Sequence, residues 1–240
     1  MPPSSSTTRP PSPRGSFGHA LAGLLDVLLP SDCVGCGAER TQLCPACRRV
    51  LTASRPGPTA LPWAHAAAPY AGPVRQLLLA HKERGALRLA GPLGEALGRA
   101  VCSALGTRAG AAPLLLVPMP SARAAVRARG QDPTLRLAGA AARSLRRAGL
   151  DARATQLLRH ARPVADQSGL NAAERRRNLH GALTVLPRVR RGLAGRQPVL
   201  VDDLVTTGAS LAEAARALAA AGLPARAAAT VAATGVRPEG

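Results

Sequence analysis

The sequence predicts an α/β fold in which helices flank a parallel sheet. From about residue 70 onward, short apolar runs alternate with segments of helical periodicity. Residues 114–117, Leu-Leu-Leu-Val, form a wholly apolar run, which is typical of a strand buried on both faces. A second run, residues 199–201, leads through a short polar loop into a helical pattern. This alternation of strands and helices favours a parallel sheet over an antiparallel one.

The length of 240 residues suits one medium-sized domain with a small appendage. No apolar stretch approaches the roughly 20 residues that cross a bilayer. The run at residues 20–29 is short, carries Asp26 and lacks the flanks of a signal peptide. We therefore expect a cytoplasmic protein without a membrane span.

The net charge of +19 raises the question of nucleic-acid binding. Lys82 is the only lysine, and the abundance of Ala, Gly, Pro and Arg indicates GC-rich coding as much as a selected basic surface. Phe17, Trp63 and Tyr70 are the only aromatic residues, too few for a base-stacking platform. Weak, non-specific attraction to nucleic acid stays open.

Four segments follow from composition. Residues 1–16 are Pro, Ser, Thr and Arg and predict a disordered tail. Residues 17–51 combine a helical pattern at 17–29 with a cysteine module. Residues 52–67, rich in Pro and Ala, predict a linker, and residues 68–236 the main domain. Within it we predict helices at 73–80, 87–101, 135–148 and 211–221, and strands at 114–117, 155–158, 183–186, 199–201 and 225–232.

The cysteine module contains two Cys-x-x-Cys pairs separated by seven residues: Cys33, Cys36, Cys44 and Cys47. Zn²⁺ prefers four thiolates in a tetrahedron, and each pair presents two of them from one turn. Disulfides or redox pairs are the alternatives, but a cytosol is reducing and no thioredoxin-like pattern surrounds the pairs. The spacing predicts a structural zinc site. Cys102, in an apolar helical stretch, is expected to be a buried structural thiol.

The polar residues after strand 199–201 predict a sugar-phosphate site. Asp202 and Asp203 follow the strand directly and can hold ribose hydroxyls or a hydrated Mg²⁺. Free N–H groups at a helix start bind phosphate. The loop that would offer them consists of Thr206, Thr207, Gly208, Ala209 and Ser210. Phosphate and diol together describe a ribose 5-phosphate.

Two alternatives explain this segment less well. A Leu-Val-Asp-Asp run also begins receiver domains of response regulators, but only thirty residues follow Ser210, too few for the rest of that fold. An ordinary edge strand with a capped helix would explain Ser210 but not the two acids.

Two further polar segments are candidates for the same crevice. Arg123, Arg127 and Arg129 follow strand 114–117, where ligands of α/β sheets bind, and guanidinium groups suit phosphate oxygens. A solvated basic helix face is the alternative. Residues 159–181 form a long polar segment typical of a lid or binding loop, with Asn171 and Glu174 as a helix-capping pair. Its candidate residues are Gln167, Arg175 and Asn178.

The segment 198–211 resembles the PRPP-binding motif of type I phosphoribosyltransferases: apolar residues, two acids, two apolar residues and Thr-Thr-Gly-x-Ser. Over residues 24–235 the chain resembles the ComF family of competence-associated phosphoribosyltransferase-like proteins. The shared features are the cysteine module, the separate residues Tyr70, Arg75, Lys82 and Gly85, the segments Val117–Pro120 and Arg123–Gly130, the pattern from Gln167 to Gly181, and the PRPP motif. Many members carry Phe-Asn-Gln where this chain has Gln131-Asp132-Pro133.

The resemblance implies a type I phosphoribosyltransferase-like domain behind a zinc module. It implies PRPP with Mg²⁺ as ligand, with Asp202 and Asp203 at the ribose hydroxyls or metal waters, Thr206–Ser210 at the 5-phosphate, and the three arginines at the pyrophosphate. Transfer of phosphoribose to an unknown acceptor, such as a nucleobase, is the expected activity. The alternative is a non-catalytic sensor of PRPP or nucleotides that docks partners in DNA uptake, the physiology linked to the family.

Overall fold

The computed structural model describes residues 32–122, 126–127, 129–163, 172–187, 193 and 195–235. The predicted tail at 1–16 and the predicted helix at 17–29 lie outside these residues. Arg123 and Gln167 lie outside them too, so their predicted roles stay predictions.

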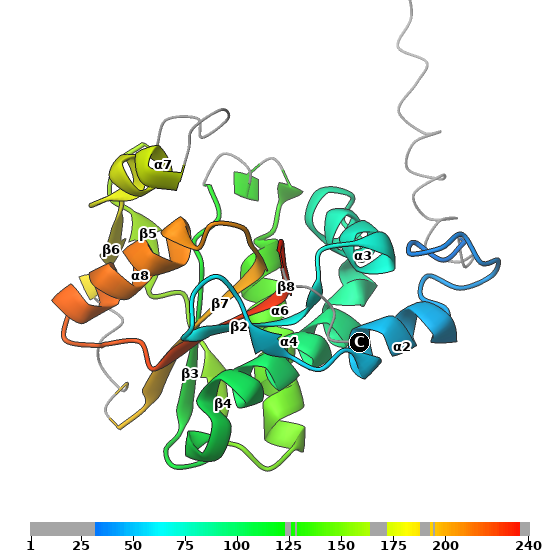
Figure 1. Ribbon diagram of the computed structural model, residues 1–240, viewed down its shortest axis with the longest axis horizontal. Helices are drawn as coiled ribbons and strands as arrows, with labels where there is room; N and C mark the ends of the chain where they lie inside the picture. Colours follow the sequence, from blue (N-terminus) through cyan, green and yellow to red (C-terminus); the bar gives the residue numbers. More distant parts are fainter. Residues whose placement is uncertain are drawn as a thin grey trace, which may run out of the picture.

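Within the described residues, six strands form one sheet in the order β1-β2-β8-β7-β3-β4 (Figure 1). The strands are β1 (Gly57–Pro58), β2 (Ala64–Pro69), β3 (Leu114–Pro118), β4 (Ala152–Ala154), β7 (Gln197–Val205) and β8 (Ala227–Ala233). The strands from β2 through β8, β7 and β3 to β4 are all parallel, whereas β1 pairs antiparallel with β2 at the edge. Every residue of β3 and β8 is buried. The predicted α/β class with a mostly parallel sheet is confirmed.

Helices cover both faces of this sheet and enclose two apolar cores. One core joins alternate residues of β3, such as Leu114 and Leu116, to α3, α4 and α6. The other joins Leu115 and Val117 to α8, as the period of two in a strand requires. The helices are α2 (Pro45–Ala53), α3 (Gly72–Glu83), α4 (Ala90–Leu105), α6 (Pro133–Arg147), α7 (Ala172–Leu179) and α8 (Ala209–Ala220), with short 3₁₀ turns η1 (Leu87–Leu89) and η2 (Gly106–Arg108).

A small second sheet lies beside α8. It pairs β5 (Leu158–His160) antiparallel with β6 (Leu183–Val185). With α7 it lies at the same end of the molecule as α3 (Figure 1). The predicted strand at 155–158 is therefore displaced: β4 ends before it and β5 begins at its last residue. The predicted strand at 183–186 exists, but outside the main sheet.

The structure differs from the predicted linker at 52–67 over its last four residues, which belong to a strand of the sheet. Residues from Ala64 onward form β2, which pairs with β8 from Ala64↔Ala228 to Pro69↔Ala233. Alanine and proline are poor strand formers, which is why composition indicated a linker. Burial overrides propensity here, because Ala64, Ala66, Ala67 and Ala68 are almost fully buried between the two helical layers.

Candidate functional site

β3 and β7 form a topological switch point of the sheet, because the connections that follow these neighbouring strands leave in opposite directions. β3 continues through α6 to β4 on one side, and β7 continues through α8 to β8 on the other. Ligands of open α/β sheets bind outside the carboxyl ends of the strands at such a switch point. The predicted acids lie near the carboxyl end of β7, and the predicted arginine segment comes after β3.

The two acids lie inside β7, two to three residues before its end, and not after it as predicted. Pairing with β3 ends at Pro118↔Val201, whereas β7 continues beside β8 with Asp202↔Thr230 and Leu204↔Ala232. The acids are therefore presented where β7 extends past its neighbour β3. Asp203 faces α3, because Lys82 at the end of that helix contacts its carboxylate.

Lys82 at the end of α3 binds Asp203. Its Nζ lies 2.9 Å from one carboxylate oxygen and 3.2 Å from the other, and the Asp203 residue is only 8% exposed. Burial lowers the pKa of Lys82 and the Asp203 carboxylate raises it, with a raised pKa as the net result. Sequence reasoning noted Lys82 within the family pattern and assigned it no role. The sequence contained one indication of such a role, because Lys82 is the only lysine in an arginine-rich chain.

Asp202 accepts a hydrogen bond from the backbone N–H of Asp203 at 2.8 Å. Burial raises the pKa of the Asp202 carboxyl well above its usual value, and the neighbouring Asp203 charge raises it further. Two adjacent acids with one amine beside them form a compact group that can accept hydroxyl protons or coordinate a hard cation.

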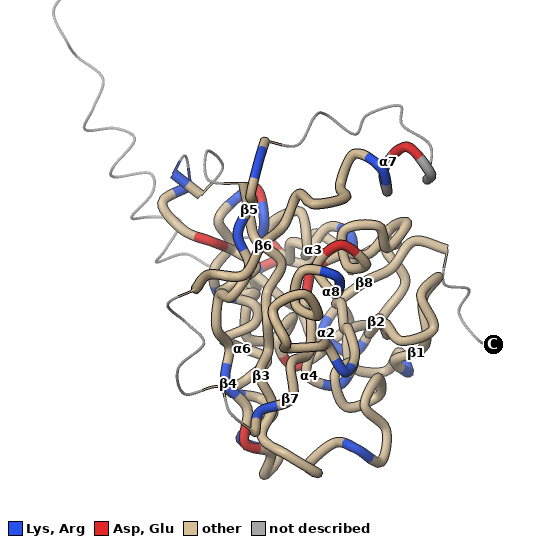
Figure 2. Tube along the Cα trace, turned by 90° about the vertical axis from the view of Figure 1, so that its left-hand side faces the viewer, with Lys and Arg blue, Asp and Glu red and all other residues tan. Residues whose placement is uncertain are grey.

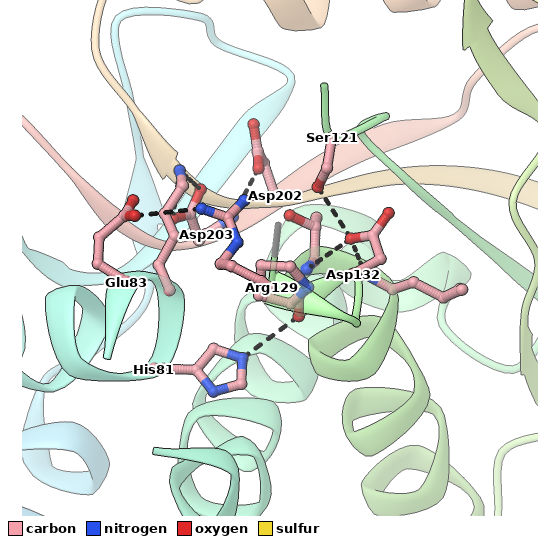
Figure 3. A network of polar contacts seen from close by, with 11 residues as sticks. His81, Glu83, Ser121, Arg129, Asp132, Asp202 and Asp203 are labelled. Atoms are coloured by element: carbon pink, nitrogen blue, oxygen red, sulfur yellow. Dashed lines mark hydrogen bonds and ion pairs between the residues drawn. The ribbon is translucent and has the colours of Figure 1, made fainter. Parts of the chain in front are cut away.

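Arg129 joins this group from the segment after β3. Its guanidinium donates to Glu83 at 3.1 Å, and its buried Nε has no hydrogen-bond partner among the described residues. Figure 3 shows Arg129 and Glu83 beside Asp202 and Asp203. Arg127 is exposed on the preceding helical turn. Of the three predicted arginines, the structure thus places Arg129 at the acid pair.

The residues that depart from the family pattern begin α6. Asp132 caps this helix by accepting from the backbone N–H groups of Thr134 and Leu135 at 3.0 and 3.1 Å. The Ser121 hydroxyl also donates to Asp132, at 2.9 Å, and the buried His81 ring contacts the Pro133 carbonyl oxygen at 3.2 Å (Figure 3). The departure therefore supplies an N-cap that ties the start of α6 to the loop after β3 and to α3.

The predicted phosphate loop connects β7 to α8. The helix begins at Ala209, two residues earlier than predicted, so Ala209 and Ser210 form its first turn. Gly208 adopts a left-handed conformation with φ of 75°, and a Cβ there would lie 2.5 Å from a Leu61 methyl group. Thr206 and Thr207 are exposed beside this helix start. The loop presents hydroxyls and helix N–H groups at the switch point.

The predicted lid is described only in part. Gln167 and the side chain of Arg175 lie outside the described portion, and the Asn178 carbonyl accepts a hydrogen bond from Arg162 at 2.7 Å.

Glu213 of α8 connects this helix to the small sheet. Its carboxylate accepts hydrogen bonds from the Leu183 N–H at 3.1 Å and from Arg216 at 2.7 and 2.8 Å. Burial raises the pKa of Glu213, but Arg216 and the backbone donors lower it more, so the net pKa is lowered.

The four cysteines of the predicted zinc site converge. Their sulfur atoms all lie within 4.8 Å of one another, and Cys36 Sγ and Cys44 Sγ are 3.6 Å apart. Tetrahedral zinc with four thiolates separates the sulfurs by about 3.8 Å. Burial raises the pKa of Cys33, but N–H groups of Cys44, Cys36 and Gly35 lower it to about 6, which favours a thiolate at this position. Burial and the neighbouring sulfurs raise the pKa of Cys47, and the pKa of Cys36 is raised as well. The donor set fits a structural metal such as zinc.

The cysteine cluster packs directly on the helices of the main domain. A Cβ on Gly35 would lie 2.7 Å from Cys47 Sγ and 3.2 Å from Pro73 in the first turn of α3. Arg99 of α4 donates to the carbonyls of Leu51, Thr52 and Ser54 at the end of α2. The module is therefore docked against α3 and α4.

Two other features bear on ligands and partners. A cavity of about 510 Å³, lined by residues such as Arg196, Pro198 and Arg226, opens at the amino ends of the strands, and the acid pair does not line it. The acid pair lies near the other end of β7. Lys and Arg positions are spread from β4 and β7 to β5 and α7 (Figure 2). Among the described residues, no helix has the length and hydropathy to cross a membrane.

No protein-family model matches this chain, and no curated protein matches it. The functional conclusion therefore depends on the residues and their geometry.

Proposed function

We propose that the chain is a type I phosphoribosyltransferase-like protein of the ComF family. In this proposal it binds PRPP with Mg²⁺ and transfers phosphoribose to an acceptor such as a nucleobase. One observation carries the proposal: β7 presents Asp202 and Asp203 and then the Thr206–Ser210 loop at a switch point, beside Arg129. A diol, a phosphate and a second anionic group are the three chemical features these residues suit, and PRPP carries all three.

Each group has a role in the proposed reaction. The N–H groups and hydroxyls of Thr206–Ser210 hold the 5-phosphate. Asp202 and Asp203 orient the ribose hydroxyls or the waters of Mg²⁺. The C1–O bond to pyrophosphate breaks with its electron pair on the leaving oxygen, and the acceptor forms the new bond to C1. Arg127 and Arg129, with Arg123, stabilise the departing charge, so positioning and electrostatics supply the catalysis.

The cysteine cluster is proposed to hold one structural Zn²⁺. A reducing, cytoplasmic compartment is part of the proposal, because it keeps the four thiols available to the metal.

The alternative is a PRPP- or nucleotide-sensing adaptor in DNA uptake. The observation that favours it is the internal pairing of the site, in which Lys82 binds Asp203 and Glu83 binds Arg129. A protein that only senses a ligand can exchange such pairs without turnover.

A thermal-shift screen tests binding. PRPP, ribose 5-phosphate, and purine and pyrimidine bases are added with and without Mg²⁺, and a ligand at 100 times its Kd stabilises by about 2.7 kcal/mol. We expect a shift with PRPP that depends on Mg²⁺. Absence of any shift with both sugar phosphates would refute the proposed site.

Replacing Arg123, Arg127 and Arg129 with alanine then assigns the pyrophosphate end. PRPP affinity is expected to fall far more than ribose 5-phosphate affinity, because only PRPP carries the pyrophosphate. Equal losses for both ligands, or loss of DNA binding alone, favour the adaptor. Turnover with a panel of bases separates enzyme from sensor.

A further inference from the structure

Two consecutive residues at the end of α3 contact opposite charges on two other segments of the site. Lys82 contacts both carboxylate oxygens of Asp203 on β7, at 2.9 and 3.2 Å. Glu83 accepts from Arg129, in the segment after β3, at 3.1 Å. One helix end therefore supplies a counter-charge to the cation-binding half and to the anion-binding half of the site.

The position of Lys82 is the position that a divalent cation would take at Asp203. Its ammonium group lies within reach of both oxygens, as a metal ion bound to a carboxylate in bidentate fashion would. Asp203 is only 8% exposed, which leaves its carboxylate little surface for a second cation. An ammonium is also the side-chain charge closest to a metal ion in form, since it is compact and strongly hydrated, unlike the planar guanidinium that serves everywhere else in this chain.

The position of Glu83 corresponds to that of an anionic ligand group at Arg129. The Glu83 side chain is 53% exposed and that of Arg129 is 23% exposed. The acid of this pair is therefore more accessible to solvent than Asp203, the acid of the Lys82 pair. The Nε of Arg129 is buried and has no hydrogen-bond partner among the described residues, so an incoming anion would bind at the terminal nitrogens, where Nη1 now donates to Glu83. An incoming anion would replace an exposed carboxylate at a guanidinium that is already positioned.

We infer that Lys82 and Glu83, at the end of α3, occupy the positions that ligands take at this site. A divalent cation binds the acid pair only when it displaces Lys82, and an anionic ligand binds Arg129 only when it displaces Glu83. The identity of the ligand depends on the proposed function, whereas the exchange itself does not. A magnesium complex of PRPP contains both a cation and an anionic group, so it displaces Lys82 from Asp203 and Glu83 from Arg129 together. A bare cation or a bare anion exchanges only one of them.

Mn²⁺ binding tests the Lys82 half. Free Mn²⁺ is measured by electron paramagnetic resonance during titration of the full chain with its zinc in place, since Mn²⁺ prefers oxygen ligands to thiolates. Lys82→Gln is expected to raise Mn²⁺ affinity about tenfold, because the competing charge-assisted contact is gone. Lys82→Arg keeps a competing charge and is expected to stay at the wild-type level. Adding Asp203→Asn to Lys82→Gln should abolish the gain.

Pyrophosphate binding tests the Glu83 half. Inorganic pyrophosphate is titrated by calorimetry without metal. Glu83→Gln is expected to raise its affinity about two- to fivefold, a modest change because the pair is exposed. The same variant should leave Mn²⁺ affinity unchanged. Arg48 and Glu95 form a remote pair between α2 and α4 that supplies both charge controls. Arg48→Gln removes one positive charge and controls for Lys82→Gln in the Mn²⁺ titration. Glu95→Gln removes one negative charge and controls for Glu83→Gln in the pyrophosphate titration.

Unchanged or weaker Mn²⁺ binding by Lys82→Gln overturns the inference, as does a pyrophosphate affinity that does not rise in Glu83→Gln. Lys82→Met replaces Lys82→Gln if the latter does not fold. The two proposals can fail independently. If Lys82→Gln binds Mn²⁺ more tightly but PRPP does not raise the Tm in the thermal-shift screen, the exchange is supported and the phosphoribosyltransferase proposal is refuted.

Discussion

At the scale of single residues, the acid pair carries the proposed function. Asp202→Asn together with Asp203→Asn is expected to keep the fold, because both residues lie beyond the pairing of β7 with β3 and belong to neither apolar core. Mg²⁺-dependent PRPP affinity, measured by calorimetry, should fall at least about tenfold, because carboxylates are the ligands of the hydrated metal.

Asp151→Asn together with Glu95→Gln is the matched control for this double variant, since it also removes two acids, which bind arginines away from the site. It should leave PRPP affinity unchanged. An unaltered affinity in the variant of Asp202 and Asp203 would place the site elsewhere.

Gly208 combines two steric demands that substitution can separate. Gly208→Ala is expected to destabilise by about 2–4 kcal/mol, the sum of a positive φ and a clash with Leu61. Gly149→Ala has a φ of 84° and open space around it, so it should cost only about 1 kcal/mol. Urea unfolding measures both. Leu61→Ala should restore part of the loss in Gly208→Ala, and full additivity of the two changes would show that no clash occurs.

At the scale of elements, Glu213 joins α8 to β6. Its pKa is lowered in the folded state, so its contribution is present above the unfolded value of about 4.3 and is lost as pH falls through the folded pKa. Glu213→Gln is expected to cost about 1–2 kcal/mol at neutral pH, because the charged contacts with Arg216 are lost.

The free energy of unfolding, measured against pH for both proteins, checks this expectation. The difference in the free energy of unfolding between wild type and Glu213→Gln should become smaller below about pH 4, because Glu213 is then protonated and loses its charged contacts. A gap that stays constant down to the acid transition would assign the loss to packing and not to charge.

At the scale of the whole molecule, the cysteine module supports the helix that carries Lys82. Purified protein is expected to contain about one zinc per chain, as a four-thiolate site requires. Removal of the metal by a chelator should lower the Tm, by about 2–4 °C for each kcal/mol lost. A metal-free protein with the same Tm would contradict this.

Gly35→Ala tests the close packing of the module, because a Cβ there collides with Cys47 and with Pro73 of α3. It should lower the Tm, although all four cysteines remain. Gly57→Ala, which has no neighbour within 4 Å and no positive φ, is the control for exchanging glycine for alanine without a collision.

The sequence by itself determined the local features of this protein. Continuous apolar runs indicated buried parallel strands, and β3 and β8 are buried throughout, because a strand covered on both faces has no polar face to show. The spacing of the four cysteines predicted their convergence, since short turns dictate where the sulfurs lie. The order of acids, hydroxyls and glycine before α8 likewise placed the loop at a helix start.

Tertiary structure decided what depends on contacts distant in sequence. Ala64–Pro69 looked like a linker and forms β2, because burial between two helical layers outweighs the low strand propensity of alanine. Lys82 and Asp203 meet across 121 positions, and Arg129 meets Glu83 across 46. No periodicity encodes such pairs. They arise because the strand order brings β3 and β7 together and the end of α3 contacts Asp203 and Arg129 through Lys82 and Glu83. The charges of the site are therefore paired by the fold and not by the local sequence.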